Sequence, residues 1–138
     1  MEVEFPRWLG EIKDTSTEGL GFHIRKEFGG HVLALRNLDD PSKYLSSEFA
    51  LIAVEELTQN PEITFHRLRS RLRWTGISEP KFIAATNPGG KGHEWVKKYF
   101  IDRNFPKEEQ EGDKFAYVPA LPTDNPYLAE SYIQTLKS

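Results

Sequence analysis

The sequence predicts an α/β protein with a mostly parallel sheet and flanking helices. Three apolar runs of strand length are each followed by a segment with helical periodicity, beginning at Phe49. Strands that alternate with helices are typical of βαβ units, in which the strands run parallel. The first run, residues 49–54, is apolar throughout, which is typical of a strand that is buried on both faces.

Composition narrows the class of protein. The 138 residues are enough for one domain or part of one, and 38% hydrophobic with 28% charged residues are compatible with a folded core. The net charge of −3 and the isoelectric point near 5.8 give no overall attraction to nucleic acid. The absence of cysteine excludes disulfides and cysteine-based metal sites.

The chain is expected to be cytoplasmic, with no membrane partner. Residues 1–6 (MEVEFP) contain no apolar segment of the kind found in secretory signal peptides. No apolar run approaches the roughly 20 residues that a membrane-spanning helix needs.

Residues 1–48 are predicted to form a hairpin and loop region. The part before the hairpin is weakly patterned and fits either a helical turn or a strand end. Two strands are expected at residues 20–25 and 31–36, joined by a glycine-containing loop. Residues 39–42 are a predicted turn that can cap a short helix at residues 43–46.

A helix is predicted after the central strand. Asn60 is expected as its N-cap, with Pro61 at the first helical position and Glu62 in the first turn. The apolar stripe of this helix is expected at Ile63, Leu68 and Leu72, with Phe65 at its edge.

Four arginines alternate along the same predicted helix, namely Arg67, Arg69, Arg71 and Arg73. Arginines four residues apart stack like charges along a helix, which is mildly unfavourable. A helix accepts such stacking more readily beside an anionic partner such as DNA. The alternative is a solvated basic face with no binding role.

Two further units follow along the chain. Residues 81–86 are a second predicted strand, and residues 93–103 a helix whose stripe is expected in the core, with Trp95, Val96, Tyr99 and Phe100. After a polar, acidic connection, a third strand is expected at residues 114–118. The last predicted helix spans residues 127–136, with an apolar stripe of Leu128, Tyr132, Ile133 and Leu136.

Two acids, Glu55 and Glu56, directly follow the central apolar run. Carboxylates are costly to bury, and open α/β sheets bind their ligands outside the carboxyl ends of the strands. The two acids are therefore candidates for a ligand site. The alternative is that they face water in the loop that follows.

A glycine-rich stretch, NPGGKG at residues 87–92, links the second strand to its helix. Its backbone N–H groups are candidates for a phosphate cradle, although the stretch does not match G-x-x-x-x-G-K-[ST]. The alternative is a tight strand-to-helix turn. Two other chemistries are disfavoured, because no two histidines have metal-ligand spacing on one element and no G-x-S-x-G elbow exists.

The segments DDPSKY (residues 39–44), SSEF (46–49) and LIAVEE (51–56) resemble the Walker B region of the terminase large subunit of tailed bacteriophages. ATNPGG (85–90) and GHEWVK (92–97), with the Phe100–Ile101 pair, resemble its coupling motif and the following helix. DNPYL (124–128) and the Tyr132–Ile133 pair resemble the segment that leaves its ATPase core. The resemblance runs roughly from Val32 to the end, in the family's order.

The resemblance implies a P-loop NTPase-like (ASCE) domain, followed in the family by an RNase H-like nuclease, in a motor that uses ATP to package viral DNA into procapsids. It implies that Glu55 holds Mg²⁺ through the metal's water shell and that Glu56 orients the attacking water. It places Thr86 and Asn87 at the coupling motif, which senses the γ-phosphate. Glu55 is a longer acid than the aspartate common at Walker B sites.

The chain departs from the family because no Walker A sequence and no nuclease domain occur in its 138 residues. The resemblance therefore implies an incomplete P-loop sheet with the Walker A strand absent. Residues 1–48 are the hairpin and loop region, 49–105 the Walker B to coupling-motif core, and 106–138 an exit segment toward a nuclease domain. We expect a fragment, or a split or decayed prophage gene, that does not turn over ATP alone.

Without a Walker A strand, the strands at Leu51 and Phe82 either pair directly, leave a slot, or recruit another chain. An open edge of such apolar strands invites association, so poor solubility or self-association is expected.

Two functions remain open from the sequence. The first is a component of the packaging motor, with DNA, the portal, the small terminase subunit and a Walker A-bearing chain as implied partners. Mg²⁺ and ATP are the cofactors of the intact family protein, and neither is expected to bind firmly to this chain alone. The second is a non-enzymatic module that contacts DNA or another partner through the Arg67–Arg73 helix.

Overall fold

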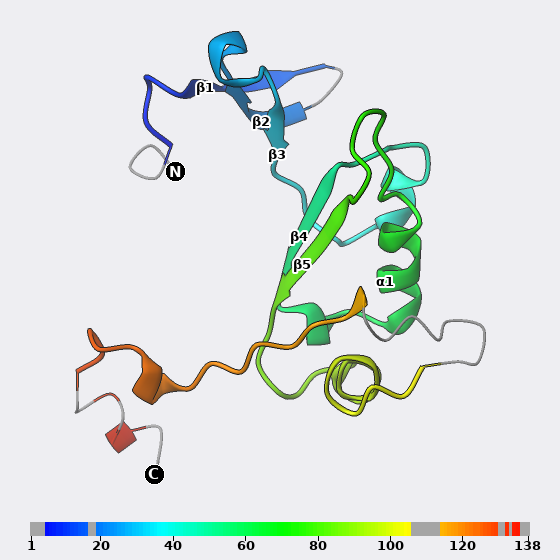
Figure 1. Cartoon of the computed structure of the whole chain (residues 1–138), viewed down its shortest axis with the longest axis vertical. Coiled ribbons are helices and arrows are strands. Elements are labelled where there is room, and N and C mark those ends of the chain that lie inside the picture. The colour runs from blue at the N-terminus through cyan, green and yellow to red at the C-terminus, as the bar shows by residue number, and fades with distance from the viewer. Residues whose placement is uncertain (1–4, 17–18, 106–113, 130–131, 133, 136–138) are drawn as a thin grey trace. The chain divides into compact units, whose positions relative to one another are not determined.

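The computed structural model of the chain describes residues 5–16, 19–105, 114–129, 132, 134 and 135. The chain divides into two compact units, Met1–Ser46 and Ser47–Ser138. Figure 1 shows both, and each is described here by itself. No described helix is long and apolar enough to cross a lipid bilayer.

The first unit contains a three-stranded antiparallel sheet. Its strands are β1 (Gly10–Thr15), β2 (Gly19–Ile24) and β3 (Val32–Ala34), in the order β1-β2-β3. The predicted hairpin is confirmed by the antiparallel pairing of β2 and β3. The part before it contains a turn at residues 7–9, in which the Leu9 amide donates to the Pro6 carbonyl at 2.9 Å, and then β1, which pairs with β2 over all six of its residues. Phe22 is the buried centre of this sheet.

Two short 3-10 turns follow β2 and β3 in the chain. One turn, η1 (Lys26–Phe28), ends at Gly29, whose φ of 108° is open to glycine at little cost. The other, η2 (Pro41–Tyr44), begins two residues before the predicted helix at residues 43–46. Asp40 caps η2, because its Oδ1 accepts a hydrogen bond from the Ser42 amide at 3.0 Å.

The second unit is built on one βαβ unit. Strands β4 (Leu51–Glu55) and β5 (Lys81–Ala85) pair in parallel, with Ile52 opposite Phe82, and helix α1 (Glu62–Arg69) lies between them in the chain. Figure 1 shows α1 alongside this strand pair. The chain is therefore a mixed α/β protein, and of the three arrangements considered for these strands it adopts direct pairing.

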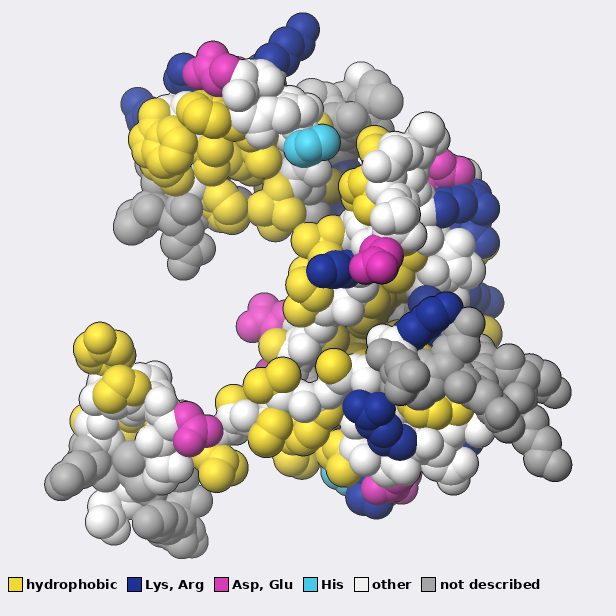
Figure 2. All heavy atoms as spheres, in the orientation of Figure 1, with side chains coloured by type: hydrophobic (Ala, Val, Ile, Leu, Met, Phe, Trp, Pro, Cys, Tyr) yellow, Lys and Arg dark blue, Asp and Glu magenta, His cyan; other side chains and the backbone are white. Residues whose placement is uncertain are grey.

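Only one face of the β4–β5 pair is buried, so the prediction of a strand enclosed on both faces was wrong. Ile52 and Val54 of β4 point into the core, whereas Leu51 is 50% exposed and Ile83 of β5 is 55% exposed. Successive side chains of a strand alternate between its faces, and α1 covers one of them. Within the described residues, nothing buries the other face, and hydrophobic side chains line it in Figure 2.

Helix α1 is shorter than the sequence suggested at both ends. Pro61, not Asn60, is its N-cap residue, because the Asn60 backbone turns toward the Trp95 side chain, whose Nε1 donates to the Asn60 carbonyl at 2.9 Å. The helix ends at Arg69, so Arg71 and Arg73 lie beyond it and the predicted stacking of like charges does not occur. Beyond Arg69 the chain instead makes a parallel bridge between Leu72 and Phe49.

Phe65 is the centre of the core of the second unit, not the edge of the helix stripe. It is 2% exposed, and its ring lies 5.1 Å from Trp95 and 5.2 Å from Phe82, centroid to centroid. Ile63, which was predicted for the stripe, is 54% exposed. Phe65 rather than Ile63 faces the core because aromatic residues that follow β5, such as Trp95, pack against that side of α1.

The helix predicted at residues 93–103 consists of a short α-helix, α2 (His93–Val96), that continues as a π-helix, η4 (Lys97–Ile101). In the π-turn the Asp102 amide donates to the Lys97 carbonyl at 2.9 Å. The prediction that the aromatic stripe belongs to the core is confirmed, since Trp95, Val96 and Tyr99 are buried.

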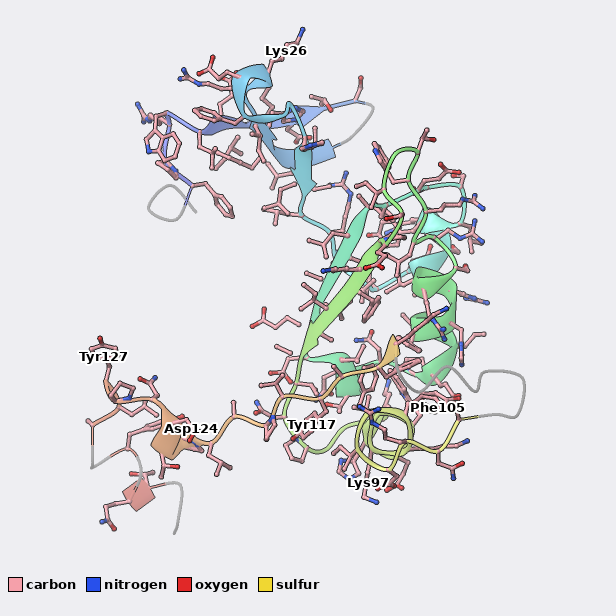
Figure 3. The ribbon with its side chains drawn as sticks, viewed as in Figure 1. Lys26, Lys97, Phe105, Tyr117, Asp124 and Tyr127 are labelled. Atoms are coloured by element: carbon pink, nitrogen blue, oxygen red, sulfur yellow. The ribbon has the colours of Figure 1, made fainter. Side chains whose placement is uncertain are left out.

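The third predicted strand, residues 114–118, does not form. Phe115 is instead held by packing, with its ring centroid 4.6 Å from that of Phe105, and its carbonyl accepts from Arg103 Nη2 at 2.9 Å. Beyond Phe115 the chain continues past Tyr117 without regular structure to the 3-10 turn η7 (Pro122–Asp124). Phe105 and Tyr117 are labelled in Figure 3. A strand requires a neighbour to pair with, and residues 115–118 have none among the described strands.

Two other predicted segments lie partly or wholly outside the described residues. The connection at residues 106–113 is one of them. Of the helix predicted at residues 127–136, the described beginning is not helical, and Tyr127 is 94% exposed in a turn. Ile133 and Leu136 of its predicted stripe lie outside the described residues.

Candidate functional site at the carboxyl ends of β4 and β5

The four polar residues predicted for one site follow neighbouring strands at the same edge of the sheet. Glu55, the last residue of β4, stands opposite Ala85, the last residue of β5. Glu56 and Thr86 come next in each chain segment, and Asn87 follows. Because parallel strands end at a common edge, the register brings these residues to one rim of the sheet.

The two acids differ in how the backbone presents them. Glu55 belongs to the open face of the sheet, on the same side of β4 as Leu51, and is exposed. Glu56 is also exposed, and its backbone is left-handed, with φ 53° and ψ 50°. Such a conformation costs an L-residue about 1–2 kcal/mol, and residues of this kind cluster at functional sites. The turn thereby directs two successive carboxylates away from the core.

Thr58, which the sequence did not single out, connects the two sides of the rim. It lies in the 3-10 turn η3 (Leu57–Gln59) directly after the acids and is 2% exposed. Its amide donates to Thr86 Oγ1 at 3.1 Å, and its Oγ1 lies 2.8 Å from Thr86 Oγ1. Its Oγ1 also donates to the Asn87 carbonyl at 3.0 Å. A buried polar residue just after two acids is the one signal in the sequence that could have identified it.

Asn87 presents its side chain differently from Thr86. The Thr86 hydroxyl is engaged with Thr58, whereas Asn87 takes part in that network through its backbone carbonyl. Asn87 is exposed, and within the described part of the chain its side-chain amide makes no hydrogen bond. A primary amide offers both a donor and an acceptor, so this group is available to an oxygen-rich ligand.

The glycine-rich stretch at residues 87–92 is a strand-to-helix turn in which two glycine amides have partners. The Gly92 amide donates to the Thr58 carbonyl at 2.7 Å, the Gly89 amide to His93 Nδ1 at 3.0 Å, and the His93 amide to the Gly90 carbonyl at 3.3 Å. A cradle for phosphate needs free amide donors that converge on one point. The Gly89 and Gly92 amides are therefore not available to such a cradle, and the stretch forms the tight turn of the alternative interpretation.

The acids fit a magnesium ion only in combination with ligands from elsewhere. Among the described residues, no cluster of three or more His, Cys, Asp or Glu side chains could hold a metal. Mg²⁺ is commonly bound through one or two protein carboxylates together with water and substrate phosphates, and Glu55 and Glu56 match that smaller requirement. The two histidines of this unit are occupied elsewhere, His66 beside Glu62 and His93 at the Gly89 amide.

Three of the four arginines proposed for DNA contact make contacts within the fold, and DNA binding by this set stays a prediction. Arg69 lies over the Phe115 ring, 5.1 Å from its centroid, and Arg73 pairs with Glu48 at 2.8 Å. Arg71 Nε donates to the Ser70 hydroxyl at 3.1 Å. Arg67 is exposed on α1. These contacts use the guanidinium groups in packing and ion pairing within the fold.

Comparison with known proteins gives one match. The family model described as phage terminase large subunit matches residues 17–138, which is most of the chain. Neither the curated proteins nor the solved structures contain a significant match.

Proposed function

Because the chain belongs to the phage terminase large subunit family, we propose that it supplies the acidic half of an ATP site in a viral DNA-packaging motor. The observation that carries this proposal is the register of β4 and β5, which brings Glu55, Glu56 and the Thr86–Asn87 pair to one rim of a parallel sheet. Phosphoryl transfer depends on positioning and charge neutralisation more than on covalent chemistry, and carboxylates with an amide are suited to both.

Each residue has a distinct role in this proposal. Glu55 holds Mg²⁺ through the water shell of the ion, and Glu56 orients the water that attacks the γ-phosphate. Asn87 contacts the phosphate end of the nucleotide, and Thr86 passes the change to the rest of the rim. The left-handed backbone at Glu56 supports its role, since strain of this kind is retained where a side chain must point in a particular direction.

The fold in this proposal is a P-loop NTPase-like (ASCE) sheet that is incomplete within these residues. The direct parallel pairing of β4 and β5, which α1 connects in the chain, supports this fold. No Walker A motif, whose lysine and backbone amides hold the β- and γ-phosphates, occurs in the 138 residues, and the Gly89 and Gly92 amides of the glycine-rich turn already have partners. A Walker A-bearing polypeptide therefore has to complete the site. DNA, the portal and the small terminase subunit are the further partners of the assembled motor.

Metal binding by the purified chain tests the roles of the acids. Mn²⁺ replaces Mg²⁺, and free Mn²⁺ is measured by electron paramagnetic resonance without ATP, because ATP would itself chelate the ion. We expect Glu55→Gln to weaken Mn²⁺ binding by about tenfold, the effect of roughly 1.4 kcal/mol. Glu79→Gln, at an exposed acid in the loop before β5, is the matched control and should leave binding unchanged. Equal effects of the two substitutions would contradict the assignment of Glu55.

Turnover gives a second test, specific to Glu56. We expect no ATP hydrolysis by the chain alone, because it lacks the groups that bind the phosphates. If purified protein hydrolyses ATP, the Glu56→Gln change has to abolish the rate. A rate that survives this substitution would exclude Glu56 as the residue that orients the water.

A further inference from the structure

The geometry points to Thr58 as a positioning residue that ties the Glu56 turn to the polar end of β5, so that the two segments move as one. The roles of the two groups that Thr58 positions, the Glu56 carboxylate and the Asn87 side-chain amide, rest on the proposed function. The tie itself rests only on the contacts of described residues.

The side chain of Thr58 sits where solvent cannot substitute for its hydrogen bonds. Thr58 is 2% exposed, and its hydroxyl oxygen lies 2.8 Å from Thr86 Oγ1 and 3.0 Å from the Asn87 carbonyl oxygen. The Thr58 amide donates to the same Thr86 oxygen at 3.1 Å. A buried hydroxyl that loses such partners suffers the full cost of its desolvation, so the network holds its two segments together.

Both threonine hydroxyls of this network donate a hydrogen bond. The Asn87 carbonyl is within 3.0 Å of the Thr58 hydroxyl and 3.2 Å of the Thr86 hydroxyl, so it accepts from one of them. The other hydroxyl then donates to its neighbour across the 2.8 Å contact. In either arrangement both threonines and the Asn87 backbone form one connected unit.

A second connection at Thr58 runs through its backbone. The Gly92 amide donates to the Thr58 carbonyl at 2.7 Å, and a Cβ at Gly90 would lie 2.6 Å from that carbonyl oxygen. The turn that follows β5 is therefore packed against η3 with no room for a side chain at Gly90. Displacement of Asn87 by a ligand is transmitted to η3, and from η3 to Glu56 directly before it in the chain.

This arrangement divides the roles of Thr86 and Asn87. The Thr86 hydroxyl is committed to Thr58, so Thr86 acts within the rim. The side-chain amide of Asn87 is exposed and is the group that meets a ligand. Thr58 is the link between the residue that contacts the ligand and the acid that acts on it.

Amide hydrogen exchange of the full chain, followed by NMR, tests the tie without any ligand. Thr58→Val removes the hydroxyl at nearly constant volume, and Thr58→Ser keeps it. We expect Thr58→Val to speed exchange of the Gly92 amide and of the residue-58 amide together, by about tenfold each. Thr86→Val should have the same effect, and the double variant should add little, because both changes break the 2.8 Å contact between the two hydroxyls. Thr58→Ser should stay within about threefold of the unmodified chain.

Thr64→Val is the matched control, since Thr64 is a second buried threonine of the same unit, on α1. It should lower the unfolding temperature without a selective increase in exchange at Gly92. If Thr58→Val affects exchange at Gly92 no more than Thr64→Val does, or if Thr58→Ser fails to preserve protection, Thr58 is not the tie.

Mn²⁺ binding without ATP separates this inference from the proposed function. Thr58→Val should weaken Mn²⁺ binding about tenfold, as the loss of residues that orient metal ligands does, and Thr58→Ser should preserve it. Mn²⁺ binding that is unchanged by Glu55→Gln removes the proposed role of Glu55, while the exchange measurement still decides whether the tie exists. Mn²⁺ binding that is unchanged by Thr58→Val overturns the positioning role.

Discussion

At the scale of single residues, Glu56 is the position where local preference and structure conflict. It is not glycine, yet it adopts a left-handed backbone at the end of β4. The Gln59 amide donates to its carbonyl at 2.9 Å, which fixes the tight η3 turn directly after the strand. A glycine is the residue expected here on conformational grounds, and a glutamate at this position is consistent with the role proposed for its carboxylate.

Replacement of Glu56 by glycine tests this view. The left-handed conformation costs a residue with a side chain about 1–2 kcal/mol. Glycine avoids this cost, but it loses more backbone entropy on folding, which lowers the free energy of unfolding by about 0.5–1 kcal/mol. We therefore expect Glu56→Gly to leave the free energy of unfolding unchanged or slightly higher in urea denaturation. Glu55→Gly, in the strand itself, should lower it by about 1 kcal/mol. Equal losses at the two positions would show that the turn is not strained.

At the scale of elements, α1 and η4 are joined by a polar contact next to the aromatic core. The buried Tyr99 hydroxyl donates to Glu62 Oε1, and His66 Nε2 lies 3.3 Å from the same oxygen. The Tyr99 hydrogen bond, supported by His66, holds the pKa of the Glu62 carboxyl below its ordinary value of 4.5. The first turn of α1 is thus anchored to the π-helix that follows α2.

This contact gives stability a defined pH dependence. A carboxyl whose pKa is lowered by folding stabilises the folded state above its unfolded pKa, and this contribution is lost as pH falls through the folded pKa. We expect Tyr99→Phe to be less stable than the unmodified chain at about pH 7, with the difference shrinking toward about pH 3. Urea denaturation across this range measures it. A difference that is independent of pH would indicate that Tyr99 acts through packing alone.

The elements also show what the sequence could and could not predict. Apolar runs and the Asn60-Pro61-Glu62 signal predicted the βαβ unit, because strands and helix starts depend on neighbours in the chain. The buried roles of Phe65 and Thr58 depend on partners 17 or more residues away, such as Phe82, Trp95 and Thr86, and periodicity carries no information on those contacts. The strand predicted at residues 114–118 failed because it required a neighbouring strand that the described fold does not provide.

At the scale of the whole molecule, the second unit presents an unusual surface for a parallel sheet. Parallel sheets are normally covered on both faces, yet the side of β4–β5 that carries Leu51, Ala53 and Ile83 is exposed within the described residues. The hydrophobic side chains beside the strands in Figure 2 belong to this face. Such a surface favours association, in keeping with the expectation drawn from the apolar strands.

Light scattering at micromolar concentration tests that expectation. We expect the unmodified chain to self-associate or to precipitate, and Ile83→Lys to shift it toward the monomer, because a charge on the open face opposes its burial. Ile63→Lys, at a comparably exposed position on α1, is the control and should not change the state. A stable monomer of the unmodified chain would argue against association through this face.

The π-turn at Lys97–Ile101 sets how the chain tolerates changes in length. Such a turn holds one residue more than the α-helix that would span the same distance, so a one-residue deletion inside it converts it to an α-turn while both flanks keep their orientation. In β4 or β5, by contrast, a one-residue deletion moves every later side chain to the opposite face. Homologues one residue shorter than this chain are therefore expected to carry their gap near Lys98, opposite a regular helix.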